Sequence, residues 1–409
     1  MKTLSAATIK QPLNLIDPDF VNNRRAYYRY LREEAPVFQA KVFILKIFVL
    51  SRYIDCVDLL RDPRFVRNRT TATGGRKSPI PLPKSLNLLT SSMILEDDPE
   101  HRRLRDLVHQ AFIPRRLRAL SDRIEQLTHE LLDQVDTSGT VNLQEVYCRP
   151  IPVTVIAEMV GVAADEVPKL AEYMDSLANG FSGWRLIKTG LWDLPKSVKF
   201  VRDLIERKRS DPQDDILTGL IQATDDAGDK LSEDELIAMV FLLIVAGHET
   251  TVHLITNAVV TLLTHPQQFA QLKANPDLMD TAIEEILRYN GPIHGTKLAY
   301  ATEDVKLHGV TIPKGAPVMP LLGAANFDPE FFDNPDQFDI TRSPNQHLGF
   351  GKGIHYCLGA PLARIETKIA LQTLFERFPD MRLAVPEQEL VLQKIPGWHR
   401  YASLPLSLR

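Results

Sequence analysis

Cysteine is scarce in this chain of 409 residues, which holds only Cys56, Cys148 and Cys357. Three such widely spaced cysteines cannot form the disulfide framework of a small secreted protein, so a reducing compartment is the simpler interpretation. They also give no tetrahedral zinc set, because His355 and Cys357 have no further cysteine nearby in the sequence. The sequence therefore excludes a disulfide scaffold and gives no support to a zinc site.

Long apolar runs are missing near the first residue, where MKTLSAATIKQP lacks the apolar core of a signal peptide. The most apolar short run, residues 42–50, contains Lys46 and is far too short to cross a bilayer, so we expect a buried strand or a hairpin there. The formal net charge of -4 argues against general nucleic-acid binding. We expect a cytoplasmic monomer that binds neither membrane nor nucleic acid.

The remaining composition is that of an ordinary globular protein, with 44% hydrophobic and 24% charged residues. The chain is long enough to bury a large core together with a cofactor.

Cys357 lies in the segment FGKGIHYCLGA, residues 350–360, where a glycine-rich loop precedes an amphipathic helical pattern. The amino end of a helix carries unpaired N–H groups and a partial positive charge, both of which favour a thiolate. Such a sulfur is suited to ligating a metal. Taken alone, a cysteine of this kind is more often a buried thiol that serves only in packing.

The spacing around the cysteine is more informative. Phe350, Gly353, His355, Cys357 and Gly359 fill the pattern Phe–x–x–Gly–x–His–x–Cys–x–Gly, and here the chain resembles the cytochrome P450 family at its haem-binding signature. The resemblance implies haem b with Cys357 as the axial thiolate, a ligand that favours O–O cleavage.

The resemblance also implies the fold. We expect a mainly α chain with small β-sheets (α+β), a helix-rich prism around a buried haem with a long central helix over its distal face. It would form a single domain over 1–409, with strand-rich portions near 36–51, 291–322 and 385–409 and a helical core over 93–290 and 357–378.

A long helix is predicted from Ser232, which forms a capping box with Glu235, to the residue before Pro266. It is apolar nearly all round, which predicts a helix that crosses the core. Its centre departs from this pattern at Ala246, Gly247, His248, Glu249, Thr250 and Thr251.

Two interpretations of this centre remain open. One is a helix kink in which Thr250 bonds back to the Ala246 carbonyl. The other follows from the resemblance: Ala246 and Gly247 let the helix pass over the haem, while Glu249 and Thr250 deliver protons to dioxygen.

His101 and Arg105 are four residues apart and therefore share a helix face. The resemblance implies that they hold haem propionates. Arg102, Arg103, Arg115, Arg116 and Arg118 form either a solvated basic face or a proximal docking patch for an acidic electron donor.

Glu285 and Arg288 are three residues apart and can pair on one helix face. By resemblance they form a structural trio with Arg342. The chain departs from the family pattern in the next strand, where Ala299 replaces an arginine that pairs with a propionate. Lys297, two residues earlier, is then the expected cofactor contact, although a lysine lacks the guanidinium fork.

The resemblance places the substrate pocket and its covering loops. Residues 67–92 and 178–196 would form the loop and lid over the haem, and lids of this kind gate access. The pocket would be lined by Leu242, Val245, Ala246, Ile293, His294 and Ile395. These are mostly apolar, so the expected substrate is hydrophobic or amphipathic, with fatty acids, terpenoids, steroids, macrolides and drug-like aromatics all open.

The function implied is a monooxygenase that inserts one oxygen atom of O₂ into a hydrophobic small molecule by hydroxylation or epoxidation. Electrons would come from a separate ferredoxin and its reductase. A peroxide-driven peroxygenase is one alternative, although it typically lacks the acid–alcohol pair that Glu249 and Thr250 form. A haem sensor or electron carrier is another, which would fill the second axial position with His248 or His253.

Overall fold

The computed structural model of the chain describes residues 4, 9, 11–75, 92–111, 114–179, 192–225 and 228–409. The chain divides into two compact units. The first unit comprises Met1–Arg76, Leu132–Cys148 and His253–Arg409, and the second comprises Lys77–Leu131 and Arg149–Val252. The boundary between Val252 and His253 falls inside one continuous helix, α13 (Glu233–Thr264). The single domain expected over the whole chain stays a prediction.

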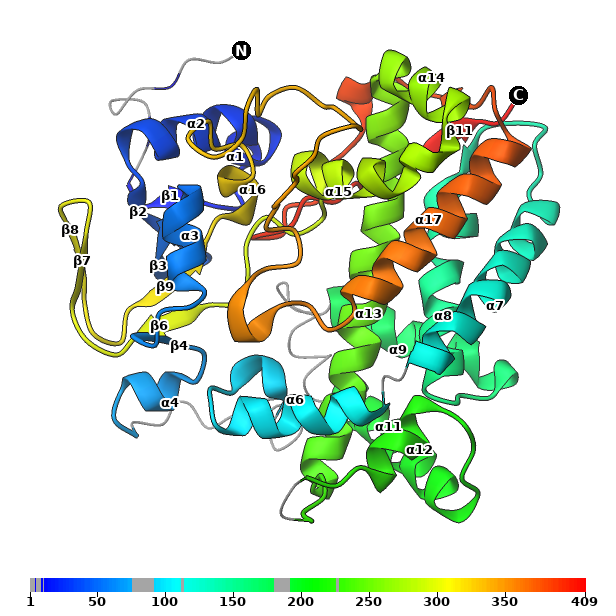
Figure 1. The fold of residues 1–409 in the computed structure, drawn as a ribbon, viewed down its shortest axis with the longest axis horizontal. Helices are drawn as coiled ribbons and strands as arrows, with labels where there is room; N and C mark the ends of the chain where they lie inside the picture. Colours follow the sequence, from blue (N-terminus) through cyan, green and yellow to red (C-terminus); the bar gives the residue numbers. More distant parts are fainter. Residues whose placement is uncertain are drawn as a thin grey trace. The chain divides into compact units, whose positions relative to one another are not determined.

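All described strands belong to the first unit. Its main sheet has six strands in the order β1-β2-β3-β9-β6-β4, so that β3 (Leu45–Leu50) pairs in parallel with β9 (Pro317–Pro320), far away in the sequence (Figure 1). The other members are β1 (Leu13–Asn14), β2 (Val37–Val42), β4 (Phe65–Val66) and β6 (Ala299–Ala301). A smaller sheet has the order β10-β11-β5, and β7 pairs with β8. These strands are β5 (Val141–Asn142), β7 (Val305–Leu307), β8 (Val310–Ile312), β10 (Arg382–Leu383) and β11 (Pro405–Ser407).

The apolar run at residues 42–50 is not one buried strand. The chain turns at Phe43 and Ile44, where Phe43 has a φ of 55° and both side chains are exposed, and then returns as β3. Of the two expected forms the hairpin is confirmed, and hydrophobicity alone could not choose between them because the turn lacks glycine and proline. Ile47 and Val49 of β3 share one face of the strand and are buried in one apolar cluster, as alternation requires, whereas Leu50 on the other face is buried in a second cluster.

The helices of the first unit flank this sheet or follow it in sequence. They are α1 (Pro18–Asn22), α2 (Arg24–Glu34), α3 (Tyr53–Leu59), α4 (Arg69–Ala72), α14 (Pro266–Ala274), α15 (Met279–Asn290), α16 (Leu322–Ala325) and α17 (Ala360–Arg377). A π-helical turn spans Gln144–Cys148, and 3₁₀ turns span Pro276–Leu278, Gly353–His355 and Glu387–Glu389.

The final portion, residues 385–409, holds less strand than expected. It contains β11 and isolated bridges of Leu392 with Tyr401 and of Ile293 with Trp398. Gly397 has a φ of 72°, and prolines lack the N–H that a ladder needs, so this segment turns repeatedly instead of forming long strands.

The second unit is helical throughout its described part. Its helices are α6 (Glu100–Ala111), α7 (Pro114–Asp133, whose last residues pass into the first unit), α8 (Pro150–Met159), α9 (Val167–Asn179), α11 (Leu194–Ser210), α12 (Ile216–Gln222) and the part of α13 up to Val252. Two 3₁₀ turns, Met93–Leu95 and Ala164–Glu166, also belong to it. Most of the two expected covering loops, residues 76–91 and 180–191, lies outside the described residues. The mainly helical fold with small sheets is as predicted.

Helix α13 begins and ends where the sequence predicts. The Ser232 N–H donates to Glu235 Oε2 at 2.7 Å and the Glu235 N–H to Ser232 Oγ at 3.3 Å, which is the expected capping box. The helix ends at Thr264, before Pro266, after 32 residues. Among the described helices it alone is long and apolar enough to span a membrane, but 72% of its most apolar window is buried, as in a core helix.

Candidate active site

Cys357 is held in a tightly formed loop three residues before α17. Its backbone N–H donates to the Phe350 carbonyl at 3.0 Å, and Gly351 and Gly353 have φ values of 71° and 74°. A Cβ on Gly353 would lie 2.3 Å from the Leu60 carbonyl oxygen, so the loop packs directly on the chain that follows α3. The glycine pattern is therefore required by backbone geometry.

The three cysteines have different surroundings. Cys56 and Cys148 are fully buried, and burial raises the pKa of the Cys148 thiol to about 12 and that of Cys56 well above its usual value. Cys357 is partly exposed. Of the three cysteines, Cys357 alone is accessible to a ligand.

The loop is braced by residues that the sequence analysis did not single out. Glu284 on α15 accepts hydrogen bonds from Arg364 Nε at 2.6 Å and interacts with His347 Nε2 at 2.9 Å. Burial raises the pKa of Glu284, but these bonds outweigh burial and lower it to about 2. The Arg364 guanidinium lies 4.5 Å from the ring centre of Phe350. The sequence offered little indication of this network, because Glu284 lies far along the chain from its partners His347 and Arg364.

Glu285, Arg288 and Arg342 meet in the first unit. Arg288 donates to both carboxylate oxygens of Glu285 at 2.8 Å, and Arg342 Nε donates to Oε2 at 3.1 Å. The side chains of Glu285 and Arg288 are both fully buried. Further Arg288 N–H groups donate to the carbonyls of Asn326, Pro335 and Gln337, so the trio ties α15 to residues 326–342.

The centre of α13 carries an accessible stripe within an otherwise buried helix. Leu242, Val245 and Thr250 are partly exposed, and Ala246 is exposed. Counted from Leu242, the other three lie three, four and eight residues later, which places all four on one face of the helix. The Thr250 hydroxyl donates to the Ala246 carbonyl at 2.7 Å, yet the helix continues without a break. The hydrogen bond from Thr250 to Ala246 that the kink interpretation expects is therefore present, and it lies beside an accessible surface.

The polar neighbours of this stripe are buried. Glu249 is 8% exposed, and its Oε1 lies 3.4 Å from His248 Nε2. His248 Nδ1 contacts the Ile244 carbonyl at 3.0 Å, and His253 is also buried. His248 is two residues from Ala246 and therefore on another face, which argues against its use as a second axial ligand. A Cβ on Gly247 would lie 3.4 Å from Ile156 Cδ1, in ordinary contact with α8.

His101 and Arg105 lie on α6, with His101 2% exposed and its Nδ1 3.6 Å from Asp98 Oδ1. Burial and then the positive charge of Arg105 lower the pKa of His101. The pair therefore offers a neutral donor beside a permanent cation.

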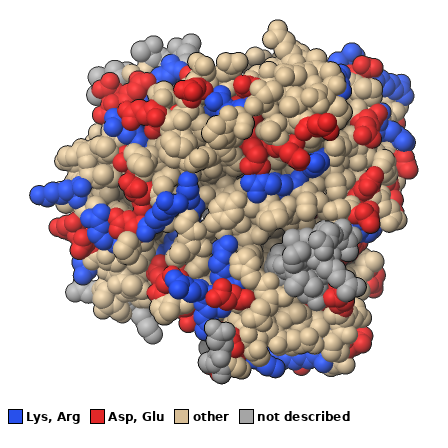
Figure 2. Space-filling view, viewed as in Figure 1, with Lys and Arg blue, Asp and Glu red and all other residues tan. Residues whose placement is uncertain are grey.

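The basic face has acidic partners in its described part. Arg102 pairs with Asp98 at 3.1 Å, and Arg103 pairs with Glu100 and Glu235. The side chains of Arg115, Arg116 and Arg118 lie outside the described residues. On the face drawn in Figure 2, acidic and basic side chains are interspersed.

Lys297 lies just before β6, and Ala299 is a buried residue of that strand. Lys297 is exposed, yet desolvation and then the charge of Arg67 lower the pKa of its ammonium group. Arg67 was not singled out from the sequence, because it lies in a stretch without periodicity.

The expected pocket residues of the first unit differ in exposure. Ile293 and Ile395 are partly exposed. His294 is buried, 3.0 Å from the Tyr28 hydroxyl, and its ring stacks on His399 at 4.9 Å. These contacts argue against the pocket-lining role expected for His294. The sequence could not reveal them, because Tyr28 and His399 lie far from His294 along the chain.

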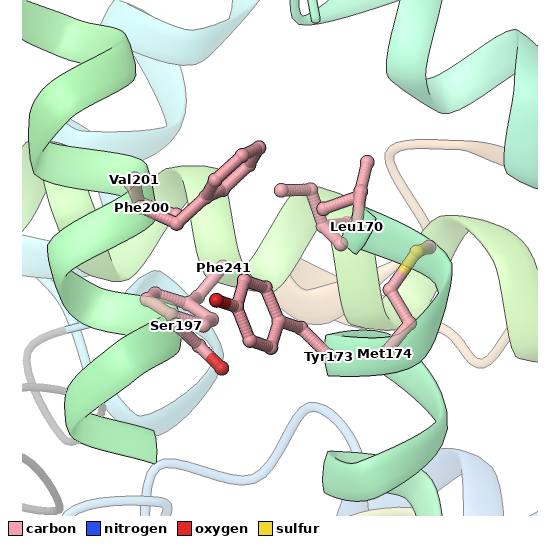
Figure 3. Close-up of a pocket in the computed structure, with 8 residues that line it drawn as sticks. Leu170, Tyr173, Met174, Ser197, Phe200, Val201 and Phe241 are labelled. Carbon is pink, nitrogen blue, oxygen red and sulfur yellow. The ribbon is translucent and has the colours of Figure 1, made fainter. Parts of the chain in front are cut away.

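A small apolar space lies within the second unit, where side chains from three helices converge (Figure 3). Tyr173 of α9 meets Phe200 of α11 edge-on at 5.7 Å, and Phe241 comes from α13. The two helices that flank the expected lid thus pack on α13 through aromatic side chains.

Comparison with known proteins agrees with this geometry. The cytochrome P450 family model matches residues 44–393. Cytochrome P450 107B1 of Saccharopolyspora erythraea is 41% identical, covering 91% of this chain and 92% of the relative, and the vitamin D(3) 25-hydroxylase of Pseudonocardia autotrophica is 39% identical, covering 97% and 96%. The solved structure of the bacillaene polyketide synthase cytochrome P450 PksS of Bacillus subtilis has a TM-score of 0.89 at 34% identity, covering 96% and 99%. The chain belongs to the cytochrome P450 family and is a haem-thiolate monooxygenase.

Proposed function

We propose that the chain binds haem b through the thiolate of Cys357 and oxidises a hydrophobic or amphipathic small molecule on the accessible face of α13. Electrons come from a separate ferredoxin-type protein and its reductase. The observation that carries this proposal is the accessible stripe of Leu242, Val245, Ala246 and Thr250 inside an otherwise buried helix. A helix whose only task was packing would bury this face as well.

The residues present fit an iron porphyrin, which has apolar faces, two carboxylates and a metal that takes a soft ligand. Cys357 is partly exposed beside the start of α17. Ala246 gives the helix centre a small, accessible apolar position. His101 and Arg105 combine a donor with a cation for a propionate.

Haem supplies the activation of O₂, and a thiolate ligand favours cleavage of the O–O bond. The chain's residues would bind the substrate, limit access of water and deliver protons. Thr250 directs its own proton to the Ala246 carbonyl, so its oxygen can accept a hydrogen bond from a group at the stripe. Glu249 would resupply protons next to Thr250 in the chain.

The pocket side chains favour an apolar substrate. Leu242, Val245, Ile293 and Ile395 contribute no charge, and apolar pockets with few polar groups are usual for small molecules. One relative is named for the 25-hydroxylation of vitamin D(3). We infer hydroxylation or epoxidation of a molecule of this general class.

The proposal is tested with the holoprotein in two steps. Titration with a panel of fatty acids, steroids, terpenoids and macrolides is followed by the haem spin-state shift, and ligands that shift the spectrum are then supplied to turnover assays. One assay contains a ferredoxin, its reductase and reduced nicotinamide cofactor, and a parallel assay contains hydrogen peroxide alone. Product in the first assay supports the monooxygenase route, whereas product with peroxide alone would favour the peroxygenase.

A further inference from the structure

Arg67 stands opposite the position where the sequence lacks the expected arginine. Strand β4 pairs antiparallel with β6, with Phe65 facing Ala301 and Val66 facing Tyr300. Continuing this register by one residue places Arg67 opposite Ala299. Side chains of directly opposed residues in antiparallel strands are near neighbours on one face of the sheet. A guanidinium on either strand can therefore reach the same ligand.

Contacts to the neighbouring strand fix the side chain of Arg67. The residue is 8% exposed, and its Nη1 and Nη2 donate to Thr296 Oγ1 at 3.4 Å and 3.3 Å. Nη1 also donates to the Lys297 carbonyl. Arg67 therefore reaches across to the residues that precede β6 instead of extending into solvent.

Lys297 adds a second cation at this place. Its side chain is exposed, but desolvation and then the charge of Arg67 lower the pKa of its ammonium group. The Arg67 guanidinium donates to the Lys297 carbonyl, so the two cationic residues are neighbours. Two neighbouring cations repel each other, and an anion that binds to both removes this cost.

Arg67 is connected to the loop of Cys357 through a short piece of chain. Gly353 packs on the Leu60 carbonyl, and the chain continues from Leu60 through β4 to Arg67 in seven residues. The ligand loop thus packs on the same short segment that carries Arg67. One haem presents its iron and its carboxylates to neighbouring parts of a protein, which makes a propionate the fitting anion.

We propose that Arg67, together with Lys297, binds a haem propionate carboxylate, so that the guanidinium absent at position 299 is supplied from the facing strand. The inference rests on the haem binding of the proposed function. The same chemistry could serve the carboxylate of a substrate, and the experiment below separates these two sources.

The first measurement is the rate at which the ferric holoprotein loses haem to excess apomyoglobin. Arg67→Ala and Arg67→Gln are compared with the wild type and with Arg69→Ala, a control that removes an exposed arginine two residues away. Loss of a charge-assisted bond to a propionate should accelerate haem release about 10- to 100-fold in both Arg67 variants. Arg69→Ala should release haem at the wild-type rate.

Two further arms identify the anion. The double variant Arg67→Ala/Ala299→Arg returns the guanidinium on the facing strand and should restore slow release. Proteins reconstituted with the dimethyl ester of haem have no propionate charge, so the difference between wild type and Arg67→Gln should disappear. Arg67→Gln retains an amide donor for Thr296, which keeps the test valid where Arg67→Ala fails to fold.

The proposal is overturned when both Arg67 variants release haem at the wild-type rate, or when their difference persists with the esterified haem. It also fails when haem release is unchanged but dodecanoic acid, unlike dodecan-1-ol, loses its spin-state shift, because Arg67 and Lys297 then bind the substrate carboxylate. The carbon monoxide difference band is recorded for each variant. A thiolate-type band shows that the Cys357 assignment stands independently of the outcome for Arg67.

Discussion

The hydroxyl of Thr250 donates a 2.7 Å hydrogen bond to the carbonyl of Ala246, one turn earlier on α13. Thr251 makes the corresponding bond to Gly247 at 3.1 Å but is buried on another face of the helix. Each threonine hydroxyl thus donates to the carbonyl four residues earlier. The two residues differ in whether the hydroxyl oxygen can be reached from the accessible stripe.

This difference predicts that Thr250→Ala uncouples electron use from product formation. In the proposed mechanism the hydroxyl takes part in proton delivery, so its loss should give about 10- to 100-fold less product per electron consumed, with hydrogen peroxide released instead. The measurement compares consumption of reduced nicotinamide cofactor with product and peroxide formed.

Thr251→Ala is the matched control and should leave the coupling unchanged. Thr250→Ser, which keeps the hydroxyl, should recover most of it. Equal uncoupling in the two alanine variants would show that helix integrity, not the Thr250 oxygen, sets the coupling.

Cys357→His should abolish the carbon monoxide difference band that is typical of thiolate-ligated ferrous haem, because an imidazole lacks the electron donation of a thiolate. Cys56→Ser is the control, since Cys56 is fully buried and its sulfur contacts the Leu50 carbonyl at 3.3 Å. The ligand assignment would be wrong if the band survived in the histidine variant.

Local signals in the sequence were sufficient for the elements whose ends are determined by local chemistry. The capping box of Ser232 and Glu235 predicted the start of α13, and Pro266 predicted its end. The glycines before Cys357 predicted a loop, and the positive φ values of Gly351 and Gly353 give the physical reason.

Features that depend on pairing between distant segments were not predictable in this way. The position of Arg67 opposite Ala299 follows from the register of β4 and β6, which are more than 230 residues apart. The contacts of His294 with Tyr28 and His399 likewise join three distant segments. Hydrophobic periodicity describes one segment at a time and contains no information about such partners.

The buried trio of Glu285, Arg288 and Arg342 predicts a large cost for removing one partner. In Arg288→Ala the Glu285 carboxylate stays buried with Arg342 as its remaining arginine partner. We expect a loss of about 3–5 kcal/mol in the free energy of unfolding. Arg377→Ala, which removes an exposed pair with Asp133, should cost at most about 1 kcal/mol. Urea unfolding followed by circular dichroism gives both values, and equal costs would contradict the prediction.

The stacked pair of His294 and His399 predicts that stability falls in mild acid. Burial, then neighbouring positive charge, lowers the pKa of both imidazoles well below the usual value; Arg24 Nη1 lies 3.2 Å from His399 Nδ1. The unfolded chain protonates these groups near pH 6.5 while the folded chain does not, so their contribution is fully present above that pH and declines below it. Each histidine should cost about 1 kcal/mol between pH 6.5 and 5.5. Urea unfolding at several pH values should show a shallower slope for His399→Gln than for the wild type, whereas His129→Gln, at an exposed position, should retain the wild-type slope.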